Sequence, residues 1–298
     1  MSGRTDLEGL YSALEESSRL LDVPCSRERV LPILTAYRDV IPDASIAFRV
    51  ATGARHAGEL DCRFLSLPKD FDPYAVALGA DLTVKTEHPV GSLLADIGQR
   101  CAVGRHGVDF GLVGGFKKTW VFFPPDNMQT LAALIAIPSM PSSVAANVDY
   151  FNGHGLEDRI SVIGIDYQYR TINVYFGAPP AESLAARNVL AMHGDAGLPR
   201  PSEQMLMLAT KAYGIYFTLS WDSAKIERIS FPVRTADPAT LSLDLDPRIE
   251  KFLHSAPVGA ADHVVFYPAM SASGEYYKVH SYYQWRAQMY ERYPKRGR

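Results

Sequence analysis

The sequence contains few cysteines, and their number and spacing exclude the usual structural role of that residue. Cys25, Cys62 and Cys101 are an odd set without the short spacings of a metal-binding motif, so a disulfide framework is not expected. We interpret them as small residues of a core or a cavity wall, in a protein of the reducing cytoplasm.

The sequence also lacks a strong excess of charge and a long apolar run. Its net charge is −3 over 298 residues, which provides no basic surface for nucleic acid. No stretch approaches the ~20 apolar residues of a membrane span, and the first residues lead into an amphipathic helix rather than an apolar signal segment. We therefore expect a soluble monomer with one domain over residues 1–298 that binds neither nucleic acid nor membrane.

Helical and strand patterns alternate along the whole chain. Helical spacing covers 7–21, 30–37, 88–101, 126–136, 142–151, 182–193, 202–209 and 248–254. Period-two alternation covers 45–52, 58–67, 104–111, 116–123, 160–167, 169–176, 211–220, 225–233, 263–270 and 276–285. The strand pairs begin roughly 50 to 60 residues apart and each follows helical sequence, which indicates an internal repeat.

This repeat predicts an α/β fold with a closed sheet. Ten antiparallel strands usually curl or close, and polar residues that face inward make sense only around a lumen. We predict a ten-stranded antiparallel barrel of five helix-helix-strand-strand units, with the helices outside. A parallel eight-stranded barrel would alternate single strands with single helices, and this chain does not.

The strand over 116–123 carries cations between aromatic rings. Period two places one set of side chains on the lumen face, namely Phe116, Lys118, Trp120 and Phe122, and the other set beneath the helices, namely Lys117, Thr119, Val121 and Phe123. An enclosed lysine must find an anion, and the rings offer flat surfaces to a planar ligand or a carbocation. The alternative is an edge strand whose lysine reaches solvent.

Later strands repeat this polar and aromatic pattern. The third pair presents Tyr169, Thr171, Asn173 and Tyr175 on one face, the fourth presents Arg228 opposite Tyr213 and Tyr216, and the fifth presents Tyr276, Lys278, His280, Tyr282 and Gln284. We interpret Gly214 as a bulge that lets both neighbouring tyrosines face inward. Lys118, Arg228 and Lys278 then converge on one cavity, which is costly unless a multiply charged anion such as a diphosphate neutralises them.

Several short motifs carry a resemblance to a known family. They are Arg55-His56-Ala57-Gly58-Glu59-Leu60-Asp61, His88-Pro89-Val90, Gly114-Gly115-Phe116-Lys117-Lys118-Thr119, Asp126-Asn127-Met128, Ile137-Pro138-Ser139-Met140-Pro141, Asn173-Val174-Tyr175-Phe176, Leu219-Ser220-Trp221 and Glu275-Tyr276-Tyr277-Lys278. Over nearly its whole length the chain resembles the bacterial ABBA-type (NphB/CloQ-like) aromatic prenyltransferases. Their fold is a ten-stranded antiparallel barrel, the PT barrel, of five αα-ββ repeats.

The resemblance implies roles for individual residues. Those expected to hold the diphosphate are Lys118, Asn173, Tyr216, Arg228 and Lys278, joined by Arg63. Those expected to line the prenyl and aromatic pockets are Trp120, Tyr169, Tyr175, Tyr213, Tyr282, Ser161 and His280. Asp61 lies where the magnesium-dependent members bind the ion. The implied reaction transfers a dimethylallyl or geranyl group to a carbon of a hydroxylated aromatic, such as a dihydroxynaphthalene or a phenazine, in secondary metabolism.

Two positions depart from the magnesium-dependent pattern. Tyr169 replaces a lysine, and Arg63 replaces a small hydroxyl residue. Arg63 lies two residues after Asp61 on the same strand face, so its guanidinium can reach that carboxylate or the diphosphate. We expect an enzyme that needs no magnesium or is only modestly stimulated by it. The alternative is that Arg63 pairs with Glu59 or Asp61 and magnesium binds beyond them.

The cavity also suggests a mechanism. Lys118, Arg228 and Lys278 would stabilise the leaving diphosphate, and the rings of Tyr175, Tyr216 and Trp120 would stabilise the allylic cation. His280 would accept the ring proton or serve only as a hydrogen-bonded wall residue. A non-catalytic carrier of aromatic or isoprenoid ligands is the rival interpretation, and it gains nothing from three buried cations. An isoprenoid synthase would carry paired Asp-rich motifs, which the sequence lacks.

Overall fold

The structure is a computed structural model that describes residues 6–53, 58–241, 245–259, 261 and 263–286. Residues 55–57 of the first motif lie outside the described residues. No helix among those described is long and apolar enough to cross a lipid bilayer.

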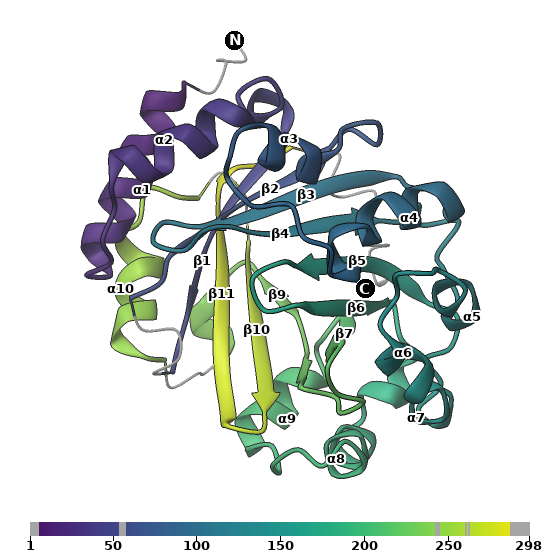
Figure 1. The fold of residues 1–298 in the computed structure, drawn as a ribbon. Coiled ribbons are helices and arrows are strands. Elements are labelled where there is room, and N and C mark those ends of the chain that lie inside the picture. The colour runs from purple at the N-terminus through teal and green to yellow at the C-terminus, as the bar shows by residue number, and fades with distance from the viewer. Residues whose placement is uncertain (1–5, 54–57, 242–244, 260, 262, 287–298) are drawn as a thin grey trace.

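Eleven strand segments form one closed antiparallel sheet at the centre of the molecule (Figure 1). They are β1 Ser45–Ala51, β2 Asp61–Leu67, β3 Arg105–Gly111, β4 Gly115–Phe122, β5 Ile160–Asp166, β6 Thr171–Gly177, β7 Gly214–Ser220, β8 Arg228–Ser230, β9 Val233–Thr235, β10 Val264–Ser271 and β11 Gly274–Gln284. Neighbours follow the chain order, and β11 pairs with both β1 and β10, which closes the barrel.

The segments β8 and β9 are two pieces of one barrel strand. Both pair with β10, so the barrel has ten strands, as the sequence predicts. The single strand expected over 225–233 is wrong in detail. It is interrupted at Pro232, which has no N–H group to donate to a neighbouring strand.

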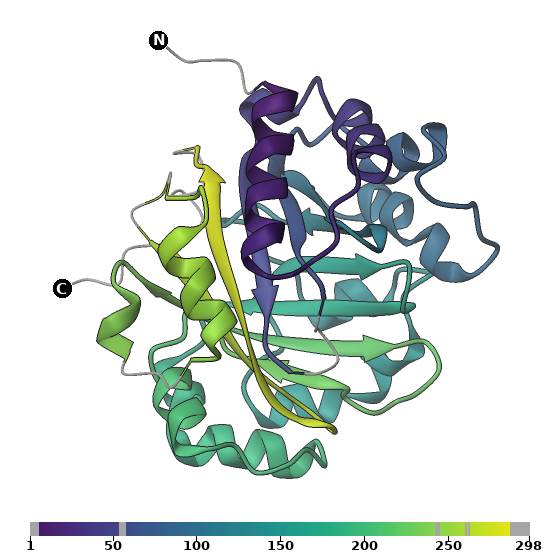
Figure 2. The same ribbon diagram turned by 90° about the vertical axis from the view of Figure 1, so that its left-hand side faces the viewer.

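The helices lie outside the barrel (Figures 1 and 2). They are α1 Leu7–Leu20, α2 Arg27–Ala36, α3 Pro73–Gly79, α4 Leu93–Arg100, α5 Leu131–Ile135, α6 Ser142–Ala146, α7 Val148–Gly153, α8 Ala186–Asp195, α9 Glu203–Ala209 and α10 Pro247–Ser255. Two or more of them precede each of the first four strand pairs, and α10 precedes the fifth. α1 packs against α10, so segments from the two ends of the chain lie side by side.

Helix α3 is absent from our sequence prediction, although its start carries a recognisable signal. The side chain of Asp72 accepts hydrogen bonds from the backbone N–H groups of Tyr74 and Ala75, and Pro73 occupies the first turn. Both features are typical of helix N-termini. The helix covers part of β3 and β4.

The strands have an outer and an inner face, and both are largely buried. Outward-facing side chains such as Val121, Ile163 and Phe217 are fully buried beneath the helices. The inner face carries a separate apolar cluster of Ala47, Leu65, Trp120, Phe122, Val162, Val265 and Tyr282. The aromatic lining expected of the lumen is therefore present.

A bulge in β4 changes which side chains face the lumen. Asp109 of β3 lies opposite Lys118, and the next residue, Phe110, lies opposite Phe116, so Lys117 is the inserted residue. Phe116 packs against the rings of Tyr74 and Tyr167 on the outer side, 6.3 and 5.5 Å between centroids. The prediction that Phe116 faces the lumen and Lys117 faces the helices was wrong, because a bulge re-aims the side chains beside it.

The bulge expected at Gly214 is not formed. The register between β6 and β7 runs without a shift through Gly177–Gly214 and Tyr175–Tyr216. Tyr213 reaches the inner cluster because it precedes the strand, where its N–H donates to the carbonyl of Pro232. A Cβ atom on Gly214 would lie only 2.8 Å from the Tyr216 ring, so glycine leaves room for that tyrosine.

Candidate active site

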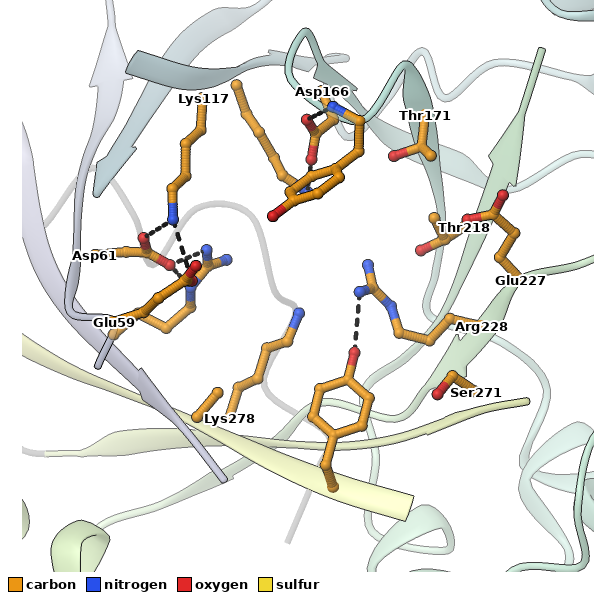
Figure 3. A pocket seen from close by; sticks show the side chains of 15 residues that line it. Glu59, Asp61, Lys117, Asp166, Thr171, Thr218, Glu227, Arg228, Ser271 and Lys278 are labelled. Carbon is orange, nitrogen blue, oxygen red and sulfur yellow. Dashed lines mark hydrogen bonds and ion pairs between the residues drawn. The ribbon is translucent and has the colours of Figure 1, made fainter. Parts of the chain in front are cut away.

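Two adjoining cavities, which share part of their lining, occupy the lumen. The outer cavity has a volume of about 210 Å³ and is lined mainly by charged and hydroxyl side chains (Figure 3). The inner cavity is smaller, with a volume of about 30 Å³, and its lining includes Trp120, Tyr175, Tyr216, Tyr267 and His280. Arg49, Lys118, Thr218, Arg228 and Lys278 line both. A ligand could therefore place a charged end in the outer cavity and an apolar end in the inner one.

Arg228 of β8 and Lys278 of β11 both point into the outer cavity, and only β10 separates their strands in the sheet (Figure 3). Arg228 donates to the hydroxyl of Tyr276 at 3.0 Å and to Oδ1 of Asn173 at 2.7 Å. Among the described residues neither cation has a carboxylate partner within ion-pair distance. Burial and the nearby charges of Arg228, Arg49 and Lys118 lower the pKa of Lys278 well below its ordinary value. Both cations are placed to receive an anion.

Asn173 adds an unused donor beside this pair. Its Oδ1 accepts hydrogen bonds from Arg228 and from Thr218, the latter at 3.1 Å. Its buried Nδ2 has no hydrogen-bond partner among the described residues. Because a buried amide without a partner is costly, an acceptor from a ligand would stabilise this arrangement.

Lys118 has a partner that sequence reasoning missed. Its Nζ lies 2.8 Å from Oδ2 of Asp166, at the end of the neighbouring strand β5. Burial and the charges of Arg228 and Arg49 outweigh this carboxylate and lower the pKa of Lys118. Lys118 is therefore paired with a carboxylate, whereas Arg228 and Lys278 have no such partner among the described residues.

Asp61 lies in a buried network rather than beside an open ion site. Its Oδ1 accepts a hydrogen bond from Lys117 at 2.7 Å, and its Oδ2 pairs with Arg49. Lys117 also lies 3.2 Å from Glu59. Burial alone would raise the pKa of Asp61, but Arg49 and Lys117 hold it well below its usual range.

Arg63 pairs with Asp109, which sequence reasoning also missed. The guanidinium donates from Nε and Nη2 to the two carboxylate oxygens at 2.5 and 2.7 Å, and it lies 4.3 Å from the centre of the Trp120 ring. The indole N–H of Trp120 donates to the same carboxylate at 3.0 Å. The alternative pairing of Arg63 with Glu59 or Asp61 was wrong, because Asp109 lies directly across from it on β3.

These residues do not fit a magnesium ion at Asp61. Both carboxylate oxygens already accept from cations, and magnesium prefers free oxygen ligands in octahedral geometry. Over the described ranges, no group of three or more His, Cys, Asp or Glu side chains could hold a metal ion.

The aromatic wall is built around Trp120. Gly107 and Gly164 lie opposite it on the two neighbouring strands, and a Cβ atom at Gly164 would come within 2.3 Å of the indole. The Tyr175 ring lies 5.3 Å from Trp120 and 3.9 Å from Tyr216. Glycine on both sides thus lets a large ring lie flat against the wall, next to two tyrosines.

The remaining predicted pocket residues divide between cavity and wall. His280 lines the inner cavity, and Tyr213 and Tyr282 belong to the inner apolar cluster. Tyr169 lies in the turn between β5 and β6, is 57% exposed and borders the outer cavity, so its expected place among the aromatic residues was wrong. Ser161 donates to the carbonyl of Tyr175 and does not line either of these two cavities, so its place in the pocket stays a prediction.

The fold and the lumen together define a class of protein. The structure matches a solved 6-dimethylallyltryptophan synthase from Micromonospora olivasterospora, in complex with DMASPP and Trp, with a TM-score of 0.52 and 10% identity over 93% of this chain and 97% of that one. A second structure, described as 6-dimethylallyl tryptophan synthase, gives 0.55 and 10% over 91% and 94%. At this identity the likeness concerns the fold, which is that of the prenyltransferase barrels.

Sequence comparison then identifies the family. The aromatic prenyltransferase Orf2 family model matches residues 5–291. A flaviolin linalyltransferase of Streptomyces virginiae is 54% identical over 96% of this chain and 95% of its own. A furaquinocin biosynthesis prenyltransferase of Streptomyces sp. (strain KO-3988) is 52% identical over 95% and 92%, and a 5,10-dihydrophenazine-1-carboxylate 9-dimethylallyltransferase of Streptomyces anulatus is 48% identical over 97% and 97%. The chain belongs to the aromatic prenyltransferase Orf2 family.

Proposed function

We propose that the enzyme transfers a prenyl group from an allylic diphosphate to a carbon of a hydroxylated aromatic acceptor and releases diphosphate. The observation that carries this proposal is the position of Arg228 and Lys278, two cations without carboxylate partners among the described residues, which line both the polar outer cavity and the aromatic inner one. Relatives named for flaviolin and for a dihydrophenazine carboxylate favour a fused-ring acceptor of secondary metabolism.

The diphosphate occupies the outer cavity in this proposal. Arg228, Lys278 and Lys118 stabilise the charge that develops on it as the C–O bond breaks. Asn173 Nδ2 and the Tyr216 hydroxyl donate to its oxygens from the inner cavity, where that cavity adjoins the outer one. Arg63 remains paired with Asp109 and acts on the ligand through its charge alone.

The prenyl chain then lies in the inner cavity against Trp120, Tyr175 and Tyr216. Their ring faces stabilise the allylic cation, and the closed barrel keeps water from converting it to an alcohol. The acceptor packs beside it, towards Tyr213 and Tyr282, and attacks through a ring carbon. The carbon that gains the prenyl group then loses its proton.

The direct test is incubation with dimethylallyl or geranyl diphosphate and a panel of dihydroxynaphthalenes, flaviolin and phenazines, followed by mass spectrometry. We expect a product heavier than the acceptor by one prenyl group, with equimolar diphosphate. Tight binding of acceptors with no diphosphate release in any combination would support the carrier interpretation instead.

We propose that the reaction needs no magnesium. Arg49 and Lys117 already neutralise Asp61, so excess EDTA is expected to leave turnover within twofold of its value in magnesium chloride. Lys117→Ala frees one oxygen of Asp61 and should become more responsive to magnesium, whereas Lys85→Ala, an exposed control, should not. Loss of activity of the unsubstituted protein in EDTA would contradict this account.

The lowered pKa of Lys278 leads to a pH prediction with inorganic diphosphate as the ligand. A bound anion raises the pKa of Lys278. At a pH between the pKa of Lys278 in the free protein and its pKa in the complex, the complex therefore holds more protons than the free protein. Proton uptake on binding is therefore expected, and affinity should fall as pH rises through this range. Calorimetry in two buffers of different ionisation enthalpy measures the uptake. Equal uptake by Lys278→Gln would show that another group is responsible.

We also propose that the chain works in the cytoplasm as a monomer with one domain over residues 1–298. Its three cysteines are unpaired thiols, which is consistent with a reducing compartment.

A further inference from the structure

His280 lies between the charged and the aromatic parts of the lumen. It shares a face of β11 with Lys278, which lines the outer cavity, and with Tyr282, which belongs to the inner apolar cluster. Residues two apart on a strand are about 7 Å apart along it. His280 is therefore level with the region between the leaving group and the acceptor, which is where the new carbon–carbon bond would form.

One nitrogen of the imidazole has no hydrogen-bond partner among the described residues. The ring lines the inner cavity, is 2% exposed and lies 4.4 Å from the ring of Tyr267 on β10. Its buried Nδ1 has no hydrogen-bond partner among the described residues, so no described group fixes the tautomer. This is unlike His193, whose Nδ1 lies 2.7 Å from the carbonyl of Val189.

The charged groups around His280 come from three strands. They are Arg49 on β1, directly opposite it in the sheet, Arg63 on β2 and Lys278 on its own strand, with Asp61 and Asp109 paired to the arginines. Burial and the three cations lower the pKa of His280 well below its ordinary value, so the imidazole is neutral in the free enzyme. A diphosphate in the outer cavity offsets these cations and makes the imidazole a better base when the substrate is bound.

We infer that His280 is the base that removes the ring proton in the reaction proposed above. The C–O bond of the donor breaks with its electron pair on diphosphate, and a ring electron pair forms the bond to the prenyl carbon. The electron pair of the ring C–H bond then returns to the ring as the proton moves to an imidazole nitrogen. The imidazolium passes this proton to the released diphosphate, and the neutral histidine is restored. The C–H group of the cationic ring intermediate is a strong acid, so a weakly basic imidazole can remove its proton. The position of His280 therefore matters more than its basicity.

The test uses dimethylallyl and geranyl diphosphate with a dihydroxynaphthalene that is deuterated at all ring carbons. In the natural protein, proton loss is fast and deuteration should leave kcat unchanged. In His280→Gln, kcat should fall at least tenfold, the donor KM should stay within threefold and a primary isotope effect should appear. His280→Ser provides a second variant, and His254→Gln on the exposed face of α10 is the matched control. Thermal unfolding identifies the variants that fold.

A second measurement separates base catalysis from a structural role. An ¹⁸O label in the donor can exchange between the bridging and non-bridging positions when the C–O bond breaks and forms again. This exchange measures ionisation of the donor even when no prenylated product forms. This exchange should persist in the His280 variants, because only proton loss is impaired. Turnover within twofold of the natural protein, or loss of exchange together with turnover and no isotope effect, would overturn the inference. Failure of the natural protein to prenylate the naphthalene would instead count against the proposed function.

Discussion

Replacing Arg228 by alanine is expected to lower kcat by roughly 10²- to 10³-fold while the protein remains folded. The described residues supply no carboxylate to Arg228, and it forms hydrogen bonds with Tyr276 and Asn173 through separate nitrogens. Its charge is therefore available to the leaving diphosphate. Steady-state kinetics at saturating donor and acceptor measure the effect, and thermal unfolding checks the fold.

Two further variants make this result specific. Arg228→Lys keeps the positive charge but loses the planar guanidinium with its paired N–H donors. The kcat of this variant should therefore lie between those of the natural protein and Arg228→Ala. Lys225→Ala removes an exposed cation from the same hairpin and should change kcat less than twofold. An Arg228→Ala enzyme with kcat within twofold of the natural protein would show that the diphosphate does not occupy the outer cavity.

Asp109→Ala is expected to have the largest effect on stability, a loss of about 3 to 5 kcal/mol in the free energy of unfolding. The carboxylate is fully buried and accepts from Arg63 and from the indole of Trp120, and it lies 3.4 Å from Arg49. Its removal leaves buried guanidinium charge without compensation. Equilibrium unfolding in urea measures the loss.

The control for this prediction is an ion pair on the surface. Glu182 and Arg187 form such a pair with both side chains largely exposed, so Glu182→Ala should cost less than about 1 kcal/mol. A loss of under 1 kcal/mol for Asp109→Ala would mean that the buried network contributes little to the fold.

The barrel could be predicted from the sequence because its signals are local and repeated. Alternating side chains mark each strand, and the apolar positions of β6, such as Val174 and Phe176, are buried in the core outside the lumen. Lys278 and His280 could be assigned to one face in the same way, because β11 pairs with its neighbours without a register shift over 274–282. In such strands a period of two is sufficient to place the site residues.

The positions that could not be predicted depend on pairing between strands. The bulge at Lys117 is defined by hydrogen bonds to β3, so the sequence of β4 alone gives no sign of it. Asp109 and Asp166 were missed because only the register places them beside Arg63 and Lys118. Arg49 was missed for the same reason, although Asp61 lies directly opposite it on β2.

The most direct test of the central claim is a crystal structure with the unreactive dimethylallyl S-thiolodiphosphate and a dihydroxynaphthalene. We expect diphosphate oxygens within hydrogen-bond distance of Arg228, Lys278 and Asn173 Nδ2, with the prenyl chain against Trp120 and Tyr175. A diphosphate bound outside the outer cavity, or a prenyl chain directed away from those rings, would contradict that claim.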